Sequence, residues 1–307
     1  MLPDEKITVR SRLGFMGLGY LGSRIARRLV TAGFPMVVYD LDHTKAMELR
    51  AFGAEAAHHP GKLASEVDVV LSCLPDEHAV QTAYLGPGNV LGSAKPGTRI
   101  IELSTISPEA SRQLHRAARQ FNVCALDVAV SGSTPSAEAG ALTLFGGGNR
   151  GVFEAAEAIF SAIAKQWFYM GPGGSGVAMK LVVNALLGVG MQAIAEAAAL
   201  GSRLGLPRDL LLDTLAKTAV VAPAHLGKLA TAKKHDYTPQ FPVRLMRKDF
   251  GLILAAAAQC GFSMPATEAA AAITSEEAES GIEEDFSVVI RRMEQQAGVQ
   301  KALPPAA

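Results

Sequence analysis

The chain has 307 residues, with 29 basic and 29 acidic side chains, so its formal net charge at neutral pH is zero. A balanced chain has no bulk field to attract nucleic acid or an anionic membrane, and we expect neither as a partner. Its three cysteines, Cys73, Cys124 and Cys260, are widely spaced and show no metal-ligand pattern, so we expect reduced thiols and no bound metal. The length suggests two domains, and the composition favours a function on small molecules.

The N-terminus differs from an export signal. Its first ten residues, MLPDEKITVR, carry charges where a secretory signal peptide needs an apolar segment. Together with the expected reduced thiols, this predicts a cytoplasmic protein.

The first half of the chain alternates short β-type runs with amphipathic helical patterns, which predicts a parallel sheet covered by helices. Strand-like runs occupy residues 13–17, 36–40, 67–74, 98–104, 123–131 and 141–148. One helix between them has a clear start, with Ser107 as N-cap and Pro108 at its first position. A helical pattern over residues 149–166 and a short strand at 167–170 complete this half, which we interpret as a doubly wound, Rossmann-type α/β domain.

A glycine-rich turn joins the first strand to the first helix, which ends near Gly33. The six residues of the turn are Gly17, Leu18, Gly19, Tyr20, Leu21 and Gly22. The GxGxxG pattern alone is weak, because glycine is frequent in this chain, but strand, turn and helix follow in the order of a dinucleotide-binding unit. Without side chains the backbone lets a pyrophosphate approach the helix N-terminus. We therefore predict dinucleotide binding here, with a purely structural turn as the alternative.

Asp40, at the end of the second strand, predicts which dinucleotide is bound. A carboxylate at this position accepts hydrogen bonds from the ribose 2′-hydroxyl of NAD and repels the 2′-phosphate of NADP. This favours NAD. His43, Thr44 and Lys45 follow as candidate phosphate ligands, so NADP stays open.

The run from Ser175 onward predicts a long helix with little polar surface. Lys180 is its only charge between Lys165 and Glu196. A membrane span would fit the apolar length, but the polar residues within the run oppose it. Snorkelling of the lysine amine to water is a second interpretation. The third is a polar cavity, because Lys180 and Asn184 are four residues apart and share one face, with about 5–6 Å between their Cβ atoms.

The second half of the chain is helical by pattern, over residues 208–218, 223–234 and 243–261. We therefore predict a dinucleotide-binding domain at residues 1–173 and an all-α substrate and oligomerisation domain at residues 174–303. The lysine helix would begin the second domain and line a cleft between the two, which is a common place for a ligand.

At this point the chain resembles the β-hydroxyacid dehydrogenases, a family that includes 3-hydroxyisobutyrate dehydrogenase and glyoxylate/succinic semialdehyde reductase. The resemblance extends from residue 13 to about residue 293 and rests on five motifs in family order. They are GFMGLGYLG (14–22), LSTISPEA (103–110), DVAVSGS (127–133), GVAMKLVVN (176–184) and FPVRLMRKD (241–249). The SGS triplet, AEAGAL (137–142) and DFSVVI (285–290) are closer to the glyoxylate/succinic semialdehyde branch.

The resemblance implies a hydride-transferring oxidoreductase that acts on a small hydroxyacid or semialdehyde acid. Lys180 would be its general acid and base, with Asn184 orienting the lysine and holding the substrate. Further substrate-binding residues implied by the resemblance are Thr105, Ser131, Gly132, Ser133, Phe241 and Asp249. Cofactor-binding residues, besides the glycine turn and Asp40, are Leu74, Pro75, Thr105 and Lys248.

Each of these roles has a simpler alternative. The Ser131–Ser133 triplet is also typical of a tight turn. Thr105 could be a structural hydroxyl that caps the end of a strand. Lys248 and Asp249 are also typical of a solvated charged face. For the whole protein, an imine reductase or a non-catalytic nucleotide-binding scaffold on the same fold are the rival functions, although Lys180 argues against both. The resemblance also implies a homodimer or homotetramer.

Overall fold

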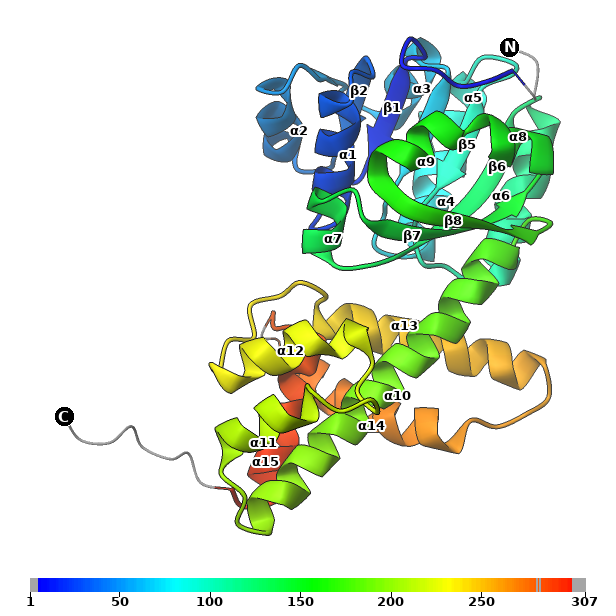
Figure 1. The fold of residues 1–307 in the computed structure, drawn as a ribbon. Helices are drawn as coiled ribbons and strands as arrows, with labels where there is room; N and C mark the ends of the chain where they lie inside the picture. The colour runs from blue at the N-terminus through cyan, green and yellow to red at the C-terminus, as the bar shows by residue number, and fades with distance from the viewer. Residues whose placement is uncertain (1–4, 280, 282, 300–307) are drawn as a thin grey trace. The chain divides into compact units, whose positions relative to one another are not determined.

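The computed structural model describes residues 5–279, 281 and 283–299 (Figure 1). The chain forms two compact units that divide between Leu181 and Val182, inside one long helix. Our sequence-based boundary at residue 173 stays a prediction.

The first unit contains an eight-stranded sheet with the strand order β3-β2-β1-β4-β5-β6-β7-β8. Its strands are β1 (Leu13–Met16), β2 (Met36–Tyr39), β3 (Glu55–Ala56), β4 (Val69–Ser72), β5 (Arg99–Glu102), β6 (Cys124–Ser131), β7 (Leu142–Gly148) and β8 (Ala164–Gly171). Strands β1 to β6 pair in parallel, and the order reverses between β1 and β4. Such a reversal is the point where doubly wound sheets bind ligands, beyond the carboxyl ends of the strands.

The expected doubly wound parallel sheet is confirmed apart from one strand pair, because β6 and β7 pair antiparallel. Residues 132–141 are all that connect them, and a parallel crossover needs about a dozen residues or more. Strand β8 then pairs parallel to β7.

Helices cover both faces of this sheet. They are α1 (Gly22–Thr31), α2 (His43–Arg50), α3 (Pro60–Glu66), α4 (Glu77–Leu85), α5 (Val90–Ser93), α6 (Pro108–Gln120), α7 (Thr134–Glu138), α8 (Arg150–Ala155) and α9 (Glu157–Ile163). Alternate strand residues form two apolar cores: Leu13 and Phe15 face α1 and α9, whereas Met16 and Val70 face the side covered by α3 to α6. As expected, the Ser107 hydroxyl caps α6 by accepting from Ala110 N–H at 3.1 Å.

The single helix expected over residues 149–166 is wrong. Two short helices, α8 and α9, stand in its place, and β8 already begins at Ala164. The letters Ala-Lys-Gln favour a helix by propensity, but pairing with β7 overrides that preference. Gln166 Nε2 donates across the strands to Thr143 Oγ1 at 2.9 Å, and Trp167 and Tyr169 pack against the core.

The second unit is helical. Its elements are the remainder of α10 (Ser175–Arg203), α11 (Arg208–Leu215), α12 (Pro223–Lys233), α13 (Val243–Gln259), α14 (Pro265–Glu279), the 3-10 turn η1 (Phe286–Val288) and α15 (Val289–Gln296). Helix α13 packs along α14, α11 along α12, and α14 against α15.

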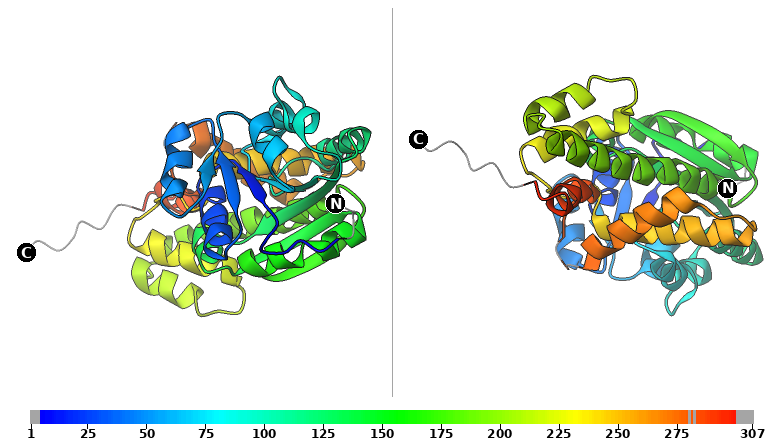
Figure 2. Two further views of the ribbon diagram at one scale, coloured as in Figure 1. Left: turned by 90° about the horizontal axis from the view of Figure 1, so that it is seen from above. Right: turned by 90° about the horizontal axis from the view of Figure 1, so that it is seen from below.

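Helix α10 runs without a break from Ser175 to Arg203, as the view from below shows (Figure 2). Among the described residues it is the one helix whose length and composition would suit a membrane span. A core helix of a soluble protein passes the same test, and one side of α10 is packed: Asn184, Met191 and Ala195 are fully buried.

Candidate active site

The glycine turn has the backbone that a pyrophosphate site needs. Gly17 adopts a φ of +87°, where L side chains are strained, and a Cβ there would come within 2.3 Å of the Cys73 carbonyl oxygen. A Cβ on Gly22 would lie 1.9 Å from the Gly17 carbonyl oxygen. These two glycines are therefore required by the turn itself. Gly19 is exposed, and a Cβ there would meet nothing within 4 Å, so its backbone is open to a ligand.

Asp40 follows β2 and braces this turn. Its Oδ2 accepts from Leu18 N–H at 2.6 Å, and its Oδ1 accepts from Asp42 N–H at 2.9 Å. Lys45 Nζ lies 3.9 Å from Oδ1. The Asp40 side chain is 13% exposed. In a dinucleotide-binding unit, the carboxylate at this position is the one that a ribose hydroxyl reaches. The turn and Asp40 together fit a dinucleotide.

Three polar residues at paired positions of neighbouring strands share one face of the sheet. Ser72, Glu102 and Asp127 occupy paired positions of β4, β5 and β6, and paired residues project to the same face. All three are buried. Polar groups in such a position require partners inside the protein.

Glu102 ties together the two loops that we expect to face the cofactor. Its carboxylate accepts from the Ser72 hydroxyl and, at 2.7 Å, from Ser104 N–H. The Ser104 hydroxyl in turn accepts from Leu74 N–H at 2.7 Å. Thr105 comes directly after Ser104 and is half-buried. One network therefore holds both the Leu74 and the Thr105 loops.

Burial changes the protonation of this network. It raises the pKa of Glu102 to about 7, although hydrogen bonds from Ser104 and Ser72 oppose that rise. The Tyr84 hydroxyl lies 2.5 Å from Ser72 Oγ, and burial raises the pKa of Tyr84 well above its usual value. Glu102 consequently titrates near neutral pH.

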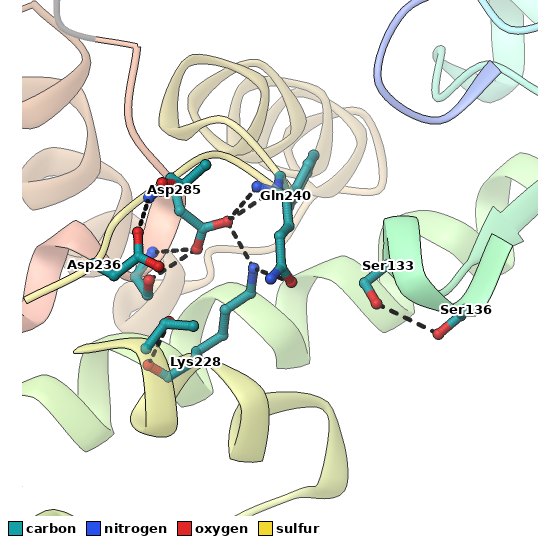
Figure 3. A network of polar contacts seen from close by, with 10 residues as sticks. Ser133, Ser136, Lys228, Asp236, Gln240 and Asp285 are labelled. Atoms are coloured by element: carbon teal, nitrogen blue, oxygen red, sulfur yellow. Dashed lines mark hydrogen bonds and ion pairs between the residues drawn. The ribbon is translucent and has the colours of Figure 1, made fainter. Parts of the chain in front are cut away.

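The Ser131–Ser133 segment connects β6 to α7. Gly132 has a φ of +139°, and a Cβ there would lie 2.8 Å from Leu142 Cδ2. Ser133 Oγ lies 3.4 Å from Ser136 Oγ (Figure 3). The segment is thus a tight turn whose serines are half-buried, which is compatible with both interpretations of the sequence.

Lys180 lies in the second turn of α10 and its side chain is half-buried. It belongs to the first unit, as do Thr105 and the Ser131–Ser133 turn. One helical turn later, in the second unit, Asn184 is completely buried and its Nδ2 donates to Asp249 Oδ2 at 2.6 Å.

Asp249 is buried in α13, so the interpretation as a solvated charged face is wrong for this residue. Lys248 Nζ lies 3.0 Å from Asp249 Oδ1, and the lysine side chain is 25% exposed. The structure thus joins three residues that the sequence assigned separately: Asn184, Lys248 and Asp249.

A polar network in the second unit brings together Lys228, Gln240 and Asp285 (Figure 3), and it also holds the backbone of Phe241. Asp285 Oδ2 accepts from the backbone N–H groups of Gln240 and Phe241, both at 3.0 Å. Lys228 Nζ donates to the same oxygen at 2.6 Å. The Phe241 ring packs edge-on against Phe286, with 5.5 Å between centroids.

Within the part of the chain that the structure describes, no three His, Cys, Asp or Glu side chains gather in a way that could hold a metal ion.

Comparison with known proteins covers both units. A family model described as the NAD binding domain of 6-phosphogluconate dehydrogenase matches residues 12–171. A second, described as NAD-binding of NADP-dependent 3-hydroxyisobutyrate dehydrogenase, matches residues 174–293. The NAD-dependent L-serine dehydrogenase of Pseudomonas aeruginosa is 36% identical over 91% of this chain and 96% of that protein. This chain belongs to the β-hydroxyacid dehydrogenase family.

Two further similarities agree with this membership. Glyoxylate/succinic semialdehyde reductase 1 of Arabidopsis thaliana is 32% identical over 91% of the chain and 96% of that protein. The crystal structure of 3-hydroxyisobutyrate dehydrogenase from Salmonella typhimurium superposes with a TM-score of 0.85 at 28% identity, covering 92% of this chain and 99% of that one. The chain is thus a nicotinamide-dependent oxidoreductase that acts on CH–OH groups.

This β-hydroxyacid dehydrogenase also contains buried, hydrogen-bonded carboxylates that were not predicted from the sequence as functional candidates. They are Glu102, Asp127 and Asp285. Asp127 is the first residue of the DVAVSGS motif, and Asp285 is the first residue of DFSVVI. The sequence of these motifs does not indicate which distant groups the two carboxylates bind.

Proposed function

We propose that this β-hydroxyacid dehydrogenase interconverts a short hydroxyacid and its aldehyde or keto acid, with Lys180 as the general acid and base. One observation carries the proposal: the single charge in the apolar first half of α10 is half-buried, one turn before a fully buried, hydrogen-bonded asparagine. A lysine amine at this place, on an otherwise apolar stretch and next to a buried amide, is suited to exchange a proton with a bound substrate.

A nicotinamide dinucleotide, when bound, would provide hydride chemistry for the substrate carbon. The protein manages the proton: the Lys180 ammonium donates it to the oxygen of the forming alcohol, and in the oxidative direction the neutral amine removes it. The glycine turn and Asp40 hold the dinucleotide. General acid catalysis of this kind contributes about 10²–10⁴-fold to turnover.

The substrate carboxylate would bind at the Ser131–Ser133 turn. Two hydroxyls and the backbone N–H groups of a tight turn are suited to hold an anion. We propose a substrate of the succinic semialdehyde, glyoxylate or 3-hydroxyisobutyrate type. Relatives of the chain include an L-serine dehydrogenase and a glyoxylate/succinic semialdehyde reductase. Among these substrates we favour succinic semialdehyde or glyoxylate because of the SGS triplet.

NAD is the cofactor that we propose over NADP, because the Asp40 carboxylate would meet the 2′-phosphate of NADP with like charge. The Pseudomonas relative is named as NAD-dependent. We also propose a homodimer or homotetramer in the cytoplasm, and no membrane or nucleic-acid partner.

The first test is the initial rate of reduced-cofactor oxidation with succinic semialdehyde and with glyoxylate, in parallel with NADH and NADPH. We expect turnover with NADH preferred. Lys180→Ala should lower kcat by about 10²–10⁴-fold and leave NADH affinity, measured by fluorescence titration, nearly unchanged.

Three outcomes would contradict parts of the proposal. Unchanged turnover in Lys180→Ala would remove the lysine from the mechanism. NADPH preference would overturn the cofactor choice alone. The imine reductase alternative would be favoured if the protein reduced a cyclic imine but neither reduced any semialdehyde nor oxidised L-serine.

A further inference from the structure

The first turn of α10 is fastened to the sheet by one buried carboxylate. Asp127, in β6, is 1% exposed. Its Oδ1 accepts from Gly174 N–H at 2.8 Å and its Oδ2 accepts from Val177 N–H at 3.0 Å. The first N–H groups of a helix have no partner inside the helix, and a negative charge beside them is stabilised by the helix dipole.

A third donor completes the coordination of this carboxylate. His115, from α6, places Nε2 at 3.0 Å from Asp127 Oδ1. A carboxylate only accepts hydrogen bonds, so the ring nitrogen is the donor. The side chain of His115 is 13% exposed. The position of Asp127 is thereby determined from β6, α6 and α10 together.

Glycines make room for this arrangement. Gly147 is paired with Asp127 across the sheet, and a Cβ on it would lie 2.7 Å from Asp127 Oδ1 and 2.9 Å from Gly176 N. A Cβ on Gly176 would lie 2.3 Å from the Phe145 carbonyl oxygen and 2.5 Å from that of Asp127. The helix can therefore start directly on the strands only because these side chains are absent. We call Asp127, His115, Gly147 and Gly176 the α10 socket.

The socket determines where the proposed catalytic lysine stands. Val177, whose N–H binds Asp127, is three residues before Lys180, so the two lie on one face of α10. Both belong to the first unit. A shift or rotation of the first turn would displace the lysine amine by a comparable distance, and a displacement of about 1 Å can cost about 10²-fold in rate.

We propose that Asp127, supported by His115, is a positioning residue that sets the orientation of Lys180 for proton transfer. This inference rests on the proposed function, in which Lys180 transfers the proton. Asp127 itself touches no reacting atom in this scheme. Its effect passes entirely through the first turn of α10.

The test is a double-mutant cycle between Asp127→Asn and Lys180→Ala. Its assay uses NADH with succinic semialdehyde, or with glyoxylate if the wild type reduces that substrate faster. An amide of the same shape cannot accept hydrogen bonds through both of its terminal atoms. We expect Asp127→Asn to lower kcat by about 10–100-fold, with KM and NADH affinity within about threefold. In the Lys180→Ala background the same change should cause no further loss, because residues that act as a unit are not additive.

A matched control separates positioning from stability. Asn89 caps α5 by accepting from Gly92 N–H at 2.6 Å, and α5 packs against α3 and α4, so Asn89→Ala removes a helix cap outside the α10 socket. We expect it to lower the melting temperature without changing kcat. Amide hydrogen exchange at residues 174–181 should rise in Asp127→Asn and stay unchanged in Asn89→Ala.

The outcomes distinguish this inference from the proposed function. Full activity of Lys180→Ala contradicts both. A large loss in Lys180→Ala with normal kcat in Asp127→Asn, or with losses that multiply in the double variant, overturns the positioning role alone. If Asp127→Asn does not fold, His115→Phe, which removes only the third donor, decides: we expect a smaller loss of kcat that again vanishes without Lys180, and normal kcat would overturn the inference.

Discussion

Asp40 accepts a hydrogen bond that holds the glycine turn, and it also carries the charge that we propose selects NAD. Only the second role requires the negative charge. Asp40→Asn keeps an acceptor for Leu18 N–H but removes the repulsion of a 2′-phosphate. We expect the ratio of kcat/KM for NADH over NADPH to fall about tenfold or more, the factor that about 1.4 kcal/mol of repulsion represents. Steady-state kinetics with both cofactors measures it.

Asp42→Asn is the control for that experiment. Asp42 caps α2 by accepting from Thr44 N–H at 3.1 Å, and hydrogen bonds from Thr44 lower its pKa. The variant removes a nearby charge without touching the turn, so its ratio should change less. An unchanged ratio in Asp40→Asn would contradict the role of its carboxylate.

Glu102 predicts a pH dependence of stability. Its pKa in the folded state is raised from 4.5 to about 7, so the folded state binds the proton more tightly than the unfolded state does. The associated stability is fully present below about pH 4.5 and is lost as the pH rises through about 7.

Glu102→Gln, which mimics the protonated acid, should therefore raise the melting temperature relative to the wild type at pH 8 and less at pH 5. The gain in unfolding free energy at the higher pH is at most about 3.5 kcal/mol, from about 1.4 kcal/mol per pKa unit. Thermal unfolding at the two pH values checks it. If Glu102→Gln raised the melting temperature more at pH 5 than at pH 8, Glu102 would be ionised in the folded protein at both pH values.

At the scale of one element, α12 carries two lysines with similar ion pairs and different surroundings. Lys228 Nζ and Lys233 Nζ each lie 2.6 Å from an aspartate oxygen, of Asp285 and Asp213 respectively. The side chain of Lys228 is 8% exposed and that of Lys233 is 33% exposed. Burial decides the consequence of removing either lysine.

Lys228→Met should destabilise the protein by about 3–5 kcal/mol, because it leaves the Asp285 carboxylate buried without its counter-ion. Lys233→Met should leave the denaturation midpoint nearly unchanged, since solvent screens its pair. Urea denaturation compares the two variants. Equal effects would mean that the buried pair contributes no more than the exposed one.

The whole molecule presents exposed apolar side chains along α10 and directly after its end. Leu186 and Leu200, in α10, are 74% and 61% exposed, and Leu204, just beyond α10, is 73% exposed. Apolar surface of this kind marks interaction sites. Leu204 N–H donates to the Leu200 carbonyl oxygen at 2.9 Å, so these two leucines lie one turn apart on the same side.

We expect light scattering to find a dimer or tetramer for the wild type, and a smaller species for the double substitution Leu200→Glu and Leu204→Glu. Charges placed in an apolar interface are costly to desolvate. Leu41→Glu, at a residue that is 92% exposed in the first unit, is the control and should keep the wild-type mass. A monomeric wild type would refute the assembly.

The sequence by itself determined what depends on neighbours along the chain. Strand and helix periods, the glycines needed at positive φ, the Ser107 cap and a single lysine in an apolar helix are all local features, and they gave the doubly wound fold, the family and the proposed catalytic residue. Only the tertiary structure decided the rest. Asp127 binds a backbone group 47 residues away, Glu102 a hydroxyl 30 away and Asp285 a lysine 57 away, and β7 reverses because of a connection too short for a crossover. A buried carboxylate is stabilised by whatever donors the fold brings to it, and the identity of those donors is absent from the local pattern.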